Sequence, residues 1–183
     1  RLYRISPAMK EAQKKELEML IQLGMLEPSR SPWAAGIVMV KKKDNPDGSA
    51  AGWRMCINYA QTVNPVMEIE CYPMPRVDEM LDDLGEAKIA SCVDAASGFW
   101  GIAVEEESRP LTAFISHTHG ALQWKRMPMG LSNAPAEFQR MMTIVLQGTG
   151  CKPFIDDVVC RSSERGLPHI NDLAVMLQRF ELA

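Results

Sequence analysis

Three aspartates stand at positions from which they could bind a divalent cation. Asp94 directly follows the apolar run 89–93, and Asp156 and Asp157 stand together between two short apolar runs. Clustered carboxylates repel one another and raise each other's pKa unless a cation neutralises them. A few hard oxygen ligands suit Mg²⁺ or Mn²⁺, which keep several waters and bind phosphates. Two such ions about 4 Å apart could activate a hydroxyl group and stabilise a leaving pyrophosphate.

The adjacent aspartates cannot serve as two equivalent ligands. Neighbouring residues of a strand point to opposite faces, so we expect one member of the Asp156 and Asp157 pair to be a ligand and the other to be auxiliary. An Asp-Asp pair is also common in ordinary turns, so the pair alone is weak evidence for a metal site. We interpret the similar pair Asp82 and Asp83 as the polar side of an amphipathic helix.

The periodicity of apolar residues predicts the elements that must position these carboxylates. Expected helices cover residues 7–24, 76–85, 134–147 and 168 onward, the first with Ser6 as its N-cap. Expected strands cover residues 37–40, 53–58, 89–93, 112–116, 122–127, 152–155 and 158–161, with a loop at 44–52 and a mixed stretch at 99–104. This mixed order of elements favours an α+β fold.

The charges are distributed unevenly along the chain. The whole chain carries 20 Lys and Arg against 23 Asp and Glu, a net charge of −3. Residues 1–54 hold 10 basic and 6 acidic side chains, whereas residues 55–110 hold 3 and 11. A nucleic-acid partner would therefore need a local basic patch. Lys41, Lys42 and Lys43 form one at the end of an expected strand, and Arg54 returns to the same region on the next strand.

Other bulk features narrow the class of protein. The five cysteines are odd in number and have no C-x-x-C spacing, which indicates neither a disulfide framework nor a zinc site. No apolar run approaches the length needed to cross a bilayer, so we expect no membrane partner. We therefore predict a cytoplasmic or nuclear protein that is not secreted. The helical pattern of the last residues has no stop signal, and we expect a fragment of a longer polyprotein.

Short motifs follow one another over nearly the whole chain. They are YRISP at 3–7, SPWA at 31–34, VKKKD at 40–44, WRMCINY at 53–59, YPMPR at 72–76, VD at 93–94, SGF at 97–99, TAF at 112–114, MPMGLSNAP at 127–135, FQRMM at 138–142 and FIDD at 154–157. Together and in this order, they resemble the reverse transcriptase domain of gypsy-type LTR retrotransposons and, more distantly, of retroviruses.

The resemblance implies a right-hand polymerase whose palm is an antiparallel sheet backed by helices. Residues 1–70 and 105–128 would form the fingers, and residues 71–104 and 129–183 the palm, with no thumb, connection or ribonuclease H. The implied activity is RNA-directed DNA synthesis, which transfers dNMP from a dNTP to a primer 3′-hydroxyl. The implied partners are an RNA or DNA template with its primer, a dNTP and the remaining domains of a polyprotein.

The resemblance also assigns roles around two Mg²⁺ or Mn²⁺ ions. Asp94 and Asp156 match the metal-binding carboxylates, the carbonyl of Ala95 matches a backbone ligand, and Asp157 matches a less direct third carboxylate.

Further matches surround the nucleotide. Lys42 and Arg54 match residues that clamp the triphosphate, which suits the bidentate chemistry of guanidinium with phosphate. The backbone amides of Ser97 and Gly98 match those that approach the triphosphate. Phe99 matches the sugar gate, where a ring would clash with a ribose 2′-hydroxyl.

Other positions lie close to the pocket or depart from the family pattern. Gly130 matches a residue beneath the templating pair, and Met129 stands beside the nucleotide pocket in place of Phe or Gln. Asn58 and Ala60 replace the usual Asp and Arg. Pro153 lies in the strand before the Asp pair, where it cannot donate to a ladder, so we expect a distorted hairpin.

The sequence is also compatible with two other functions. The chain could be a catalytically inert, truncated retroelement remnant that binds nucleic acid or has a structural role, which the departures and the missing thumb would favour. It could also be a metal-dependent nuclease using the same aspartates. That reading gives Lys42, Arg54 and Phe99 no role.

Overall fold

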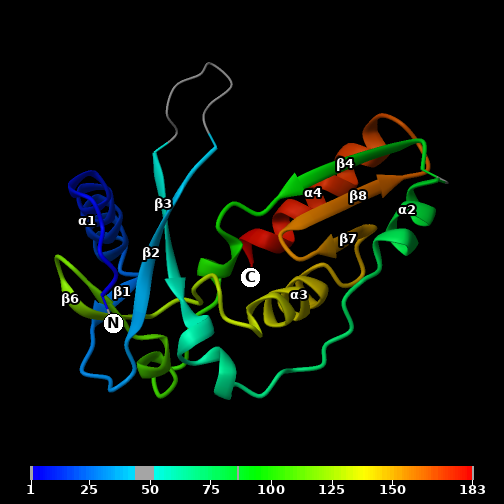
Figure 1. Cartoon of the computed structure of the whole chain (residues 1–183). Coiled ribbons are helices and arrows are strands. Elements are labelled where there is room, and N and C mark those ends of the chain that lie inside the picture. Colours follow the sequence, from blue (N-terminus) through cyan, green and yellow to red (C-terminus); the bar gives the residue numbers. More distant parts are fainter. Residues whose placement is uncertain (1, 44–51, 86, 183) are drawn as a thin grey trace. The chain divides into compact units, whose positions relative to one another are not determined.

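The computed structural model describes residues 2–43, 52–85 and 87–182, which form two compact units. Unit 1 comprises Arg1–Glu68 and Phe99–Ala134, and unit 2 comprises Ile69–Gly98 and Pro135–Ala183. Figure 1 labels the α-helices and most of the strands of both units. Most of the expected loop at 44–52 lies outside the described residues.

Unit 1 is built on a mixed five-stranded sheet with the strand order β1-β6-β5-β2-β3. Strands β2 and β3 form the expected antiparallel hairpin, while β2 and β5 run parallel. The strands are β1 (Leu26–Pro28), β2 (Ala35–Lys41), β3 (Trp53–Asn58), β5 (Phe114–Ser116) and β6 (Gly120–Trp124). Short 3-10 helices cover Tyr59–Gln61, Asn64–Val66, Gly98–Gly101 and Arg109–Thr112.

Helix α1 (Pro7–Gln22) begins where the sequence predicts it to begin. The Ser6 hydroxyl accepts a hydrogen bond from the Met9 N–H at 3.3 Å, which satisfies one of the free donors of the first turn. The helix ends at Gln22, and Gly24 follows with a φ of 69°, a conformation that glycine adopts without strain.

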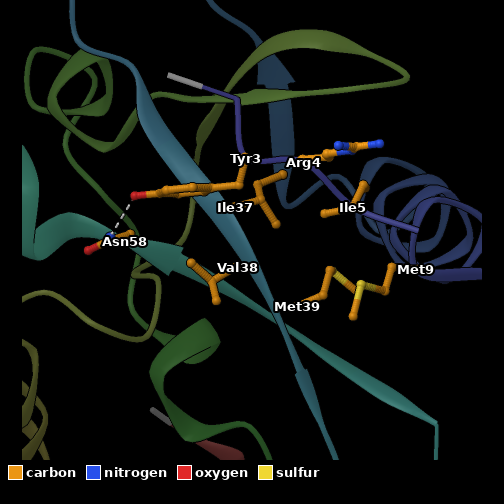
Figure 2. Close-up of a pocket in the computed structure, with 8 residues that line it drawn as sticks. All are labelled: Tyr3, Arg4, Ile5, Met9, Ile37, Val38, Met39 and Asn58. Atoms are coloured by element: carbon orange, nitrogen blue, oxygen red, sulfur yellow. Dashed lines mark hydrogen bonds between the residues drawn. The ribbon is translucent and has the colours of Figure 1, made fainter. Parts of the chain in front are cut away.

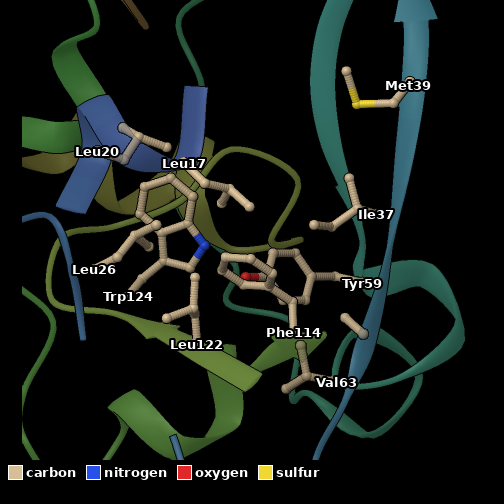
Figure 3. Close-up of a cluster of buried hydrophobic side chains, with 11 residues drawn as sticks. Leu17, Leu20, Leu26, Ile37, Met39, Tyr59, Val63, Phe114, Leu122 and Trp124 are labelled. Carbon is tan, nitrogen blue, oxygen red and sulfur yellow. The ribbon is translucent and has the colours of Figure 1, made fainter. Parts of the chain in front are cut away.

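The core of unit 1 joins this helix to the sheet. Figure 3 shows Leu17 and Leu20 of α1 beside Phe114 and Trp124 of the sheet. Tyr59 is also buried, and its hydroxyl donates to the Thr112 carbonyl at 2.8 Å. Burial raises the pKa of this phenol well above its ordinary value, so it stays a hydrogen-bond donor.

Replacing Leu20 by Ala should destabilise unit 1 by about 2–5 kcal/mol, because a side chain 1% exposed leaves a cavity that the neighbours fill only in part. The free energy of unfolding in urea measures this loss. Leu23→Ala is the matched control, since Leu23 is 57% exposed just after the same helix and its truncation should cost less than about 1 kcal/mol. Equal losses for both variants would contradict the packing described above.

Unit 2 is built on an antiparallel three-stranded sheet with the order β4-β8-β7. The strands are β4 (Ile89–Asp94), β7 (Cys151–Phe154) and β8 (Asp157–Ser162), and the helices are α2 (Val77–Gly85), α3 (Ala134–Val145) and α4 (Leu167–Glu181). Val158, Cys160 and Ser162 of β8 are buried, in alternation with more exposed residues. The hydroxyl of Ser162 contacts His169 Nδ1 at 3.0 Å, which ties α4 to the buried face of the sheet.

Pro153 does not distort the ladder between β7 and β8. All four residues of β7 have partners in register, with Phe154 opposite Asp157 and Pro153 opposite Val158. Hydrogen-bonded and non-hydrogen-bonded pairs alternate in an antiparallel ladder, and a two-residue turn is closed by a hydrogen-bonded pair. Pro153 therefore occupies a non-hydrogen-bonded pair on an edge strand, where the sheet needs no N–H.

The two units divide the chain at slightly different points from the expected fingers and palm. Residues 99–104 group with unit 1, because Ala103 bridges to Arg126 and the Met127 N–H donates to the Ile102 carbonyl at 2.9 Å. Residues 129–134 also group with unit 1. Within the described ranges, no helix is long and apolar enough to span a membrane.

Candidate active site

The three aspartates lie together at one end of the sheet in unit 2. Asp94 is the last residue of β4 and pairs directly with Asp157, the first residue of β8. Directly opposite residues of antiparallel strands point to the same face, with Cβ atoms about 4.5–5.5 Å apart. Asp156 precedes Asp157, and its carbonyl accepts a hydrogen bond from the Ala95 N–H at 2.7 Å. The register of β4 and β8 therefore brings Asp94 and Asp157, which are 63 positions apart in the sequence, to the same end of the sheet.

The turn between β7 and β8 consists of Ile155 and Asp156. Ile155 has a φ of 54°, a region in which a β-branched residue is strained by about 1–3 kcal/mol. Asp157 is not in the turn but begins the strand, so the two aspartates have different surroundings. Asp156 is half-buried and Asp157 is exposed. The direction of the Asp156 side chain depends on how the surrounding chain holds Ile155.

The oxygen atoms at this site suit a cation whose coordination shell is completed by a substrate. Among the described residues, no three His, Cys, Asp or Glu side chains form a group that could hold a metal ion alone. Magnesium in proteins commonly takes one or two carboxylates and completes its shell with water and phosphate oxygens. Asp94, Asp156 and the Ala95 carbonyl could supply such a partial shell. The carbonyl already accepts the Gly98 N–H at 3.1 Å and keeps a second lone pair.

The loop after β4 is tight. Ser97 has a φ of 56°, and the Gly98 N–H donates to the Ala95 carbonyl. Binding of a phosphate oxygen by the Gly98 N–H would replace that hydrogen bond. Gly98 has no room for a side chain, since a Cβ atom would lie 2.4 Å from Cζ of Phe138.

Gly98→Ala should destabilise unit 2 by about 1–3 kcal/mol, because the new methyl group forces the buried Phe138 ring to move. Thermal or urea unfolding measures the change. Gly101→Ala is the matched control, since no atom lies within 4 Å of its added Cβ, and its stability should change by less than about 1 kcal/mol. If Gly98→Ala were as stable as Gly101→Ala, the close packing of this loop on Phe138 would be wrong.

The basic residues lie in unit 1, on the β2–β3 hairpin. Val40 pairs with Arg54, and the Lys42 N–H donates to the Gly52 carbonyl at 3.0 Å, which continues the hairpin beyond the strands. Lys42 stands two residues beyond Val40, so the pleat places it on the same face as Arg54. Both side chains are exposed and available to an anion.

A carboxylate of α1 lies near these two cations. Burial raises the pKa of Glu16, while a hydrogen bond from the Met55 backbone and the charges of Lys42 and Arg54 oppose that rise. The interaction shows that both cations lie within electrostatic reach of one half-buried carboxylate. An arriving triphosphate would therefore compete with Glu16 for them.

The backbone around Gly130 is held by a side-chain amide. Asn64 Nδ2 donates to the Gly130 carbonyl at 2.9 Å, and Asn64 Oδ1 accepts from the Ser132 N–H at 3.1 Å. Gly130 has a φ of 98°, and a Cβ atom there would lie 3.4 Å from the Ile57 carbonyl oxygen. Met129 is 54% exposed beside it. Phe99 is half-buried in the 3-10 helix Gly98–Gly101.

Asn58 lines a groove of about 390 Å³ in unit 1. Its Nδ2 donates to the Tyr3 hydroxyl at 3.0 Å (Figure 2). That hydroxyl in turn donates to Gln61 Oε1 at 2.9 Å. An Asp here could only accept, so it would compete with Gln61 for the single tyrosine proton. The groove is otherwise mainly apolar with one guanidinium group, and its remaining lining residues are Arg4, Ile5, Met9, Ile37, Val38 and Met39.

Sequence reasoning missed two side chains that hold site backbone, Asn64 and Gln139. Gln139 lies in α3 and is 1% exposed, and its amide contacts the β7–β8 turn. The sequence did carry a signal for Gln139. Gln139, Met142 and Leu146 follow the spacing of the buried face of a helix, which places a polar residue at a core position. Asn64 had no comparable signal, since it lies outside the expected helices and strands.

Comparison with known proteins gives a consistent result. Residues 40–182 match the family described as reverse transcriptase (RNA-dependent DNA polymerase). The chain is 39% identical over 146 residues to the retrovirus-related Pol polyprotein from transposon 412 of Drosophila melanogaster, covering 80% of this chain and 12% of that protein. It is 34% identical over 177 residues to the enzymatic polyprotein of cauliflower mosaic virus strain NY8153, covering 95% and 25%.

Solved structures show the same relationship. The crystal structure of prototype foamy virus protease-reverse transcriptase matches with a TM-score of 0.82 and 25% identity, covering 100% of this chain and 24% of that chain. The foamy viral protease-reverse transcriptase dRH in complex with double-stranded DNA matches with a TM-score of 0.78 and 27% identity, covering 100% and 31%.

Because the family match covers most of its length, the chain belongs to the reverse transcriptase family. The resemblance to retroelement reverse transcriptases and the α+β fingers-and-palm fold class are thereby confirmed. The chain spans 12% and 25% of the length of the two relatives described, both of which are named as polyproteins.

Proposed function

We propose that this chain forms the nucleotidyl-transfer core of an RNA-directed DNA polymerase of a retroelement. It would transfer dNMP from a dNTP to a primer 3′-hydroxyl on an RNA or DNA template. The supporting observation is the pairing of Asp94 with Asp157, with Asp156 in the adjoining turn, in a chain of the reverse transcriptase family. Unit 1 would act as the fingers and unit 2 as the palm.

The carboxylates would supply the metal site. Asp94, Asp156 and the Ala95 carbonyl would hold two Mg²⁺ or Mn²⁺ ions, which lower the pKa of a primer hydroxyl and stabilise negative charge on the leaving pyrophosphate. Asp157 lies opposite Asp94 on the same sheet face and would keep the local field negative. That negative field would attract cations to this end of the sheet before a nucleotide binds.

The fingers residues would bind and select the nucleotide. Arg54 would bind phosphate oxygens through its guanidinium fork, and Lys42 would add a point charge on the same face. The backbone amides of Ser97 and Gly98 would contact the triphosphate, and the ring of Phe99 would exclude a ribose 2′-hydroxyl.

The remaining expected residues would contact the base pair. Gly130 lacks a side chain, so a templating base pair could approach its backbone closely. The exposed Met129 would border the nucleotide pocket with a flexible apolar side chain. The remaining domains of a polyprotein would hold the RNA or DNA template with its primer.

Asp156→Asn should abolish primer extension with Mg²⁺, a loss of at least about a thousandfold in rate, because the neutral amide is a poor ligand for a hard cation. Primer extension on an RNA template with all four dNTPs measures it. Asp82→Asn is the matched control, since Asp82 is exposed on α2 outside the proposed site, and it should extend primers at the rate of the unchanged chain.

Normal extension by the Asp156→Asn chain would reject the proposed role of this residue. Titration with Mn²⁺ distinguishes an inert remnant from an active core that works together with further domains of a polyprotein. The inert remnant has no Mn²⁺ site that depends on Asp94 and Asp156, whereas the core retains one. Cleavage of nucleic acid without dNTPs would instead favour a nuclease.

Phe99→Val should raise the use of ribonucleotides relative to deoxyribonucleotides by about 10–100-fold, because a smaller side chain leaves space for the 2′-hydroxyl. The ratio of kcat/KM values for rNTP and dNTP measures the change. Extension with dNTP should change only a few-fold, which serves as the internal control. An unchanged ratio would remove Phe99 from the sugar-contacting residues.

A further inference from the structure

We propose that Gln139 is a positioning residue whose side-chain amide holds the turn that carries Asp156, and thereby sets the affinity of the metal site. This inference rests on the proposed function. Gln139 is 1% exposed in α3, and glutamine is rarely so buried. A buried amide costs stability unless its polar atoms are paired, so its partners show what it does.

The amide contacts the backbone on both sides of Phe154. Gln139 Nε2 donates to the Pro153 carbonyl at 3.0 Å, and Gln139 Oε1 accepts from the Ile155 N–H at 2.6 Å. Strand β7 is at the edge of its sheet, so these outward-facing groups have no neighbouring strand in unit 2. The primary amide has the donor and acceptor of one peptide unit, and it occupies the place that such a strand would take.

The orientation of the amide is fixed by its partners. The Pro153 carbonyl can only accept and the Ile155 N–H can only donate, so just one of the two amide orientations satisfies both. Nε2 also lies 3.4 Å from Thr143 Oγ1. The Thr143 hydroxyl donates to the Gln139 carbonyl at 2.8 Å, which leaves its oxygen able to accept.

The turn needs this support because Ile155 is strained. Its φ of 54° is unfavourable for a β-branched residue, which would relax to negative φ if released. Two hydrogen bonds oppose that relaxation. The Ile155 N–H is held by Gln139, and the carbonyl of the next residue, Asp156, is held by the Ala95 N–H at 2.7 Å. Loss of the first bond leaves the turn that carries Asp156 held only by the Ala95 N–H and by the Phe154–Asp157 pair at its base.

The test replaces Gln139 by Met, which keeps the length and burial of the side chain but removes both hydrogen bonds. Mn²⁺ affinity, measured by electron paramagnetic resonance titration, should fall about tenfold, the loss typical of residues that orient a metal ligand. Hydrogen exchange at the Ile155 amide should become faster.

Gln13→Met is the matched control. Gln13 is 0% exposed in α1 of unit 1, so the same substitution is made at an equally buried site of the other unit. It should leave Mn²⁺ affinity and Ile155 exchange unchanged, whatever it does to the stability of unit 1. An equal loss of Mn²⁺ affinity in both variants would show a general effect of the substitution and overturn the proposal.

A second substitution tests the cause. Glycine adopts positive φ freely, so Ile155→Gly in the Gln139→Met background should restore Mn²⁺ affinity to within about threefold of the unchanged chain. If Gln139 only filled space, relief of strain at Ile155 would restore nothing. Should Gln139→Met fail to fold, Gln139→Asn shortens the side chain by one methylene, so that its amide cannot reach both backbone groups, and should weaken Mn²⁺ binding in the same direction.

The outcomes separate this inference from the proposed function. Unchanged Mn²⁺ affinity in Gln139→Met, or unchanged exchange at Ile155, would overturn the role of Gln139. Absence of any Mn²⁺ site in the unchanged chain would overturn the proposed metal chemistry, and with it the claim that Gln139 sets affinity. The exchange measurement would still show whether the amide holds the turn.

Discussion

Unit 2 depends on the register between β4 and β8, in which Asp94 lies opposite Asp157. A shift of one residue would move every side chain of one strand to the other face, and the two carboxylates would then point apart. The alternation of buried and exposed residues along β8 fixes the register, because Val158, Cys160 and Ser162 must all face the helices. The packing of buried residues along β8 thus determines the spacing of Asp94 and Asp157 at the end of the two strands.

Side-chain hydrogen bonds hold the backbone of site segments that strand register alone does not position. In each unit a carboxamide side chain holds the backbone of a segment expected to touch nucleotide or metal. Asn64 binds on both sides of Leu131 through Gly130 and Ser132, and Gln139 binds on both sides of Phe154. An amide can satisfy a donor and an acceptor at once, which suits irregular backbone that no strand pairs with.

Much of this arrangement could be predicted from the sequence, because local rules govern it. The Ser6 cap, the β2–β3 hairpin and the helices of unit 2 follow from periodicity and capping, and the order of motifs indicated the family. The short strand β1 and the 3-10 helix at 109–112 were missed, since three or four residues carry little periodicity. Pro153 was expected to distort the hairpin, and only the edge position of β7 shows why it does not. The helical spacing of Gln139 indicates that it is buried, but it does not reveal the long-range contacts of its amide with Pro153 and Ile155.

The edge strand of unit 2 also bears on how this chain behaves beside copies of itself. An exposed edge strand invites another strand to pair with it, which leads to aggregation. In β7, Pro153 offers no outward N–H, while its carbonyl and the Ile155 N–H are already taken by Gln139. The side chain that holds the turn therefore also occupies backbone groups through which a further strand would pair with β7.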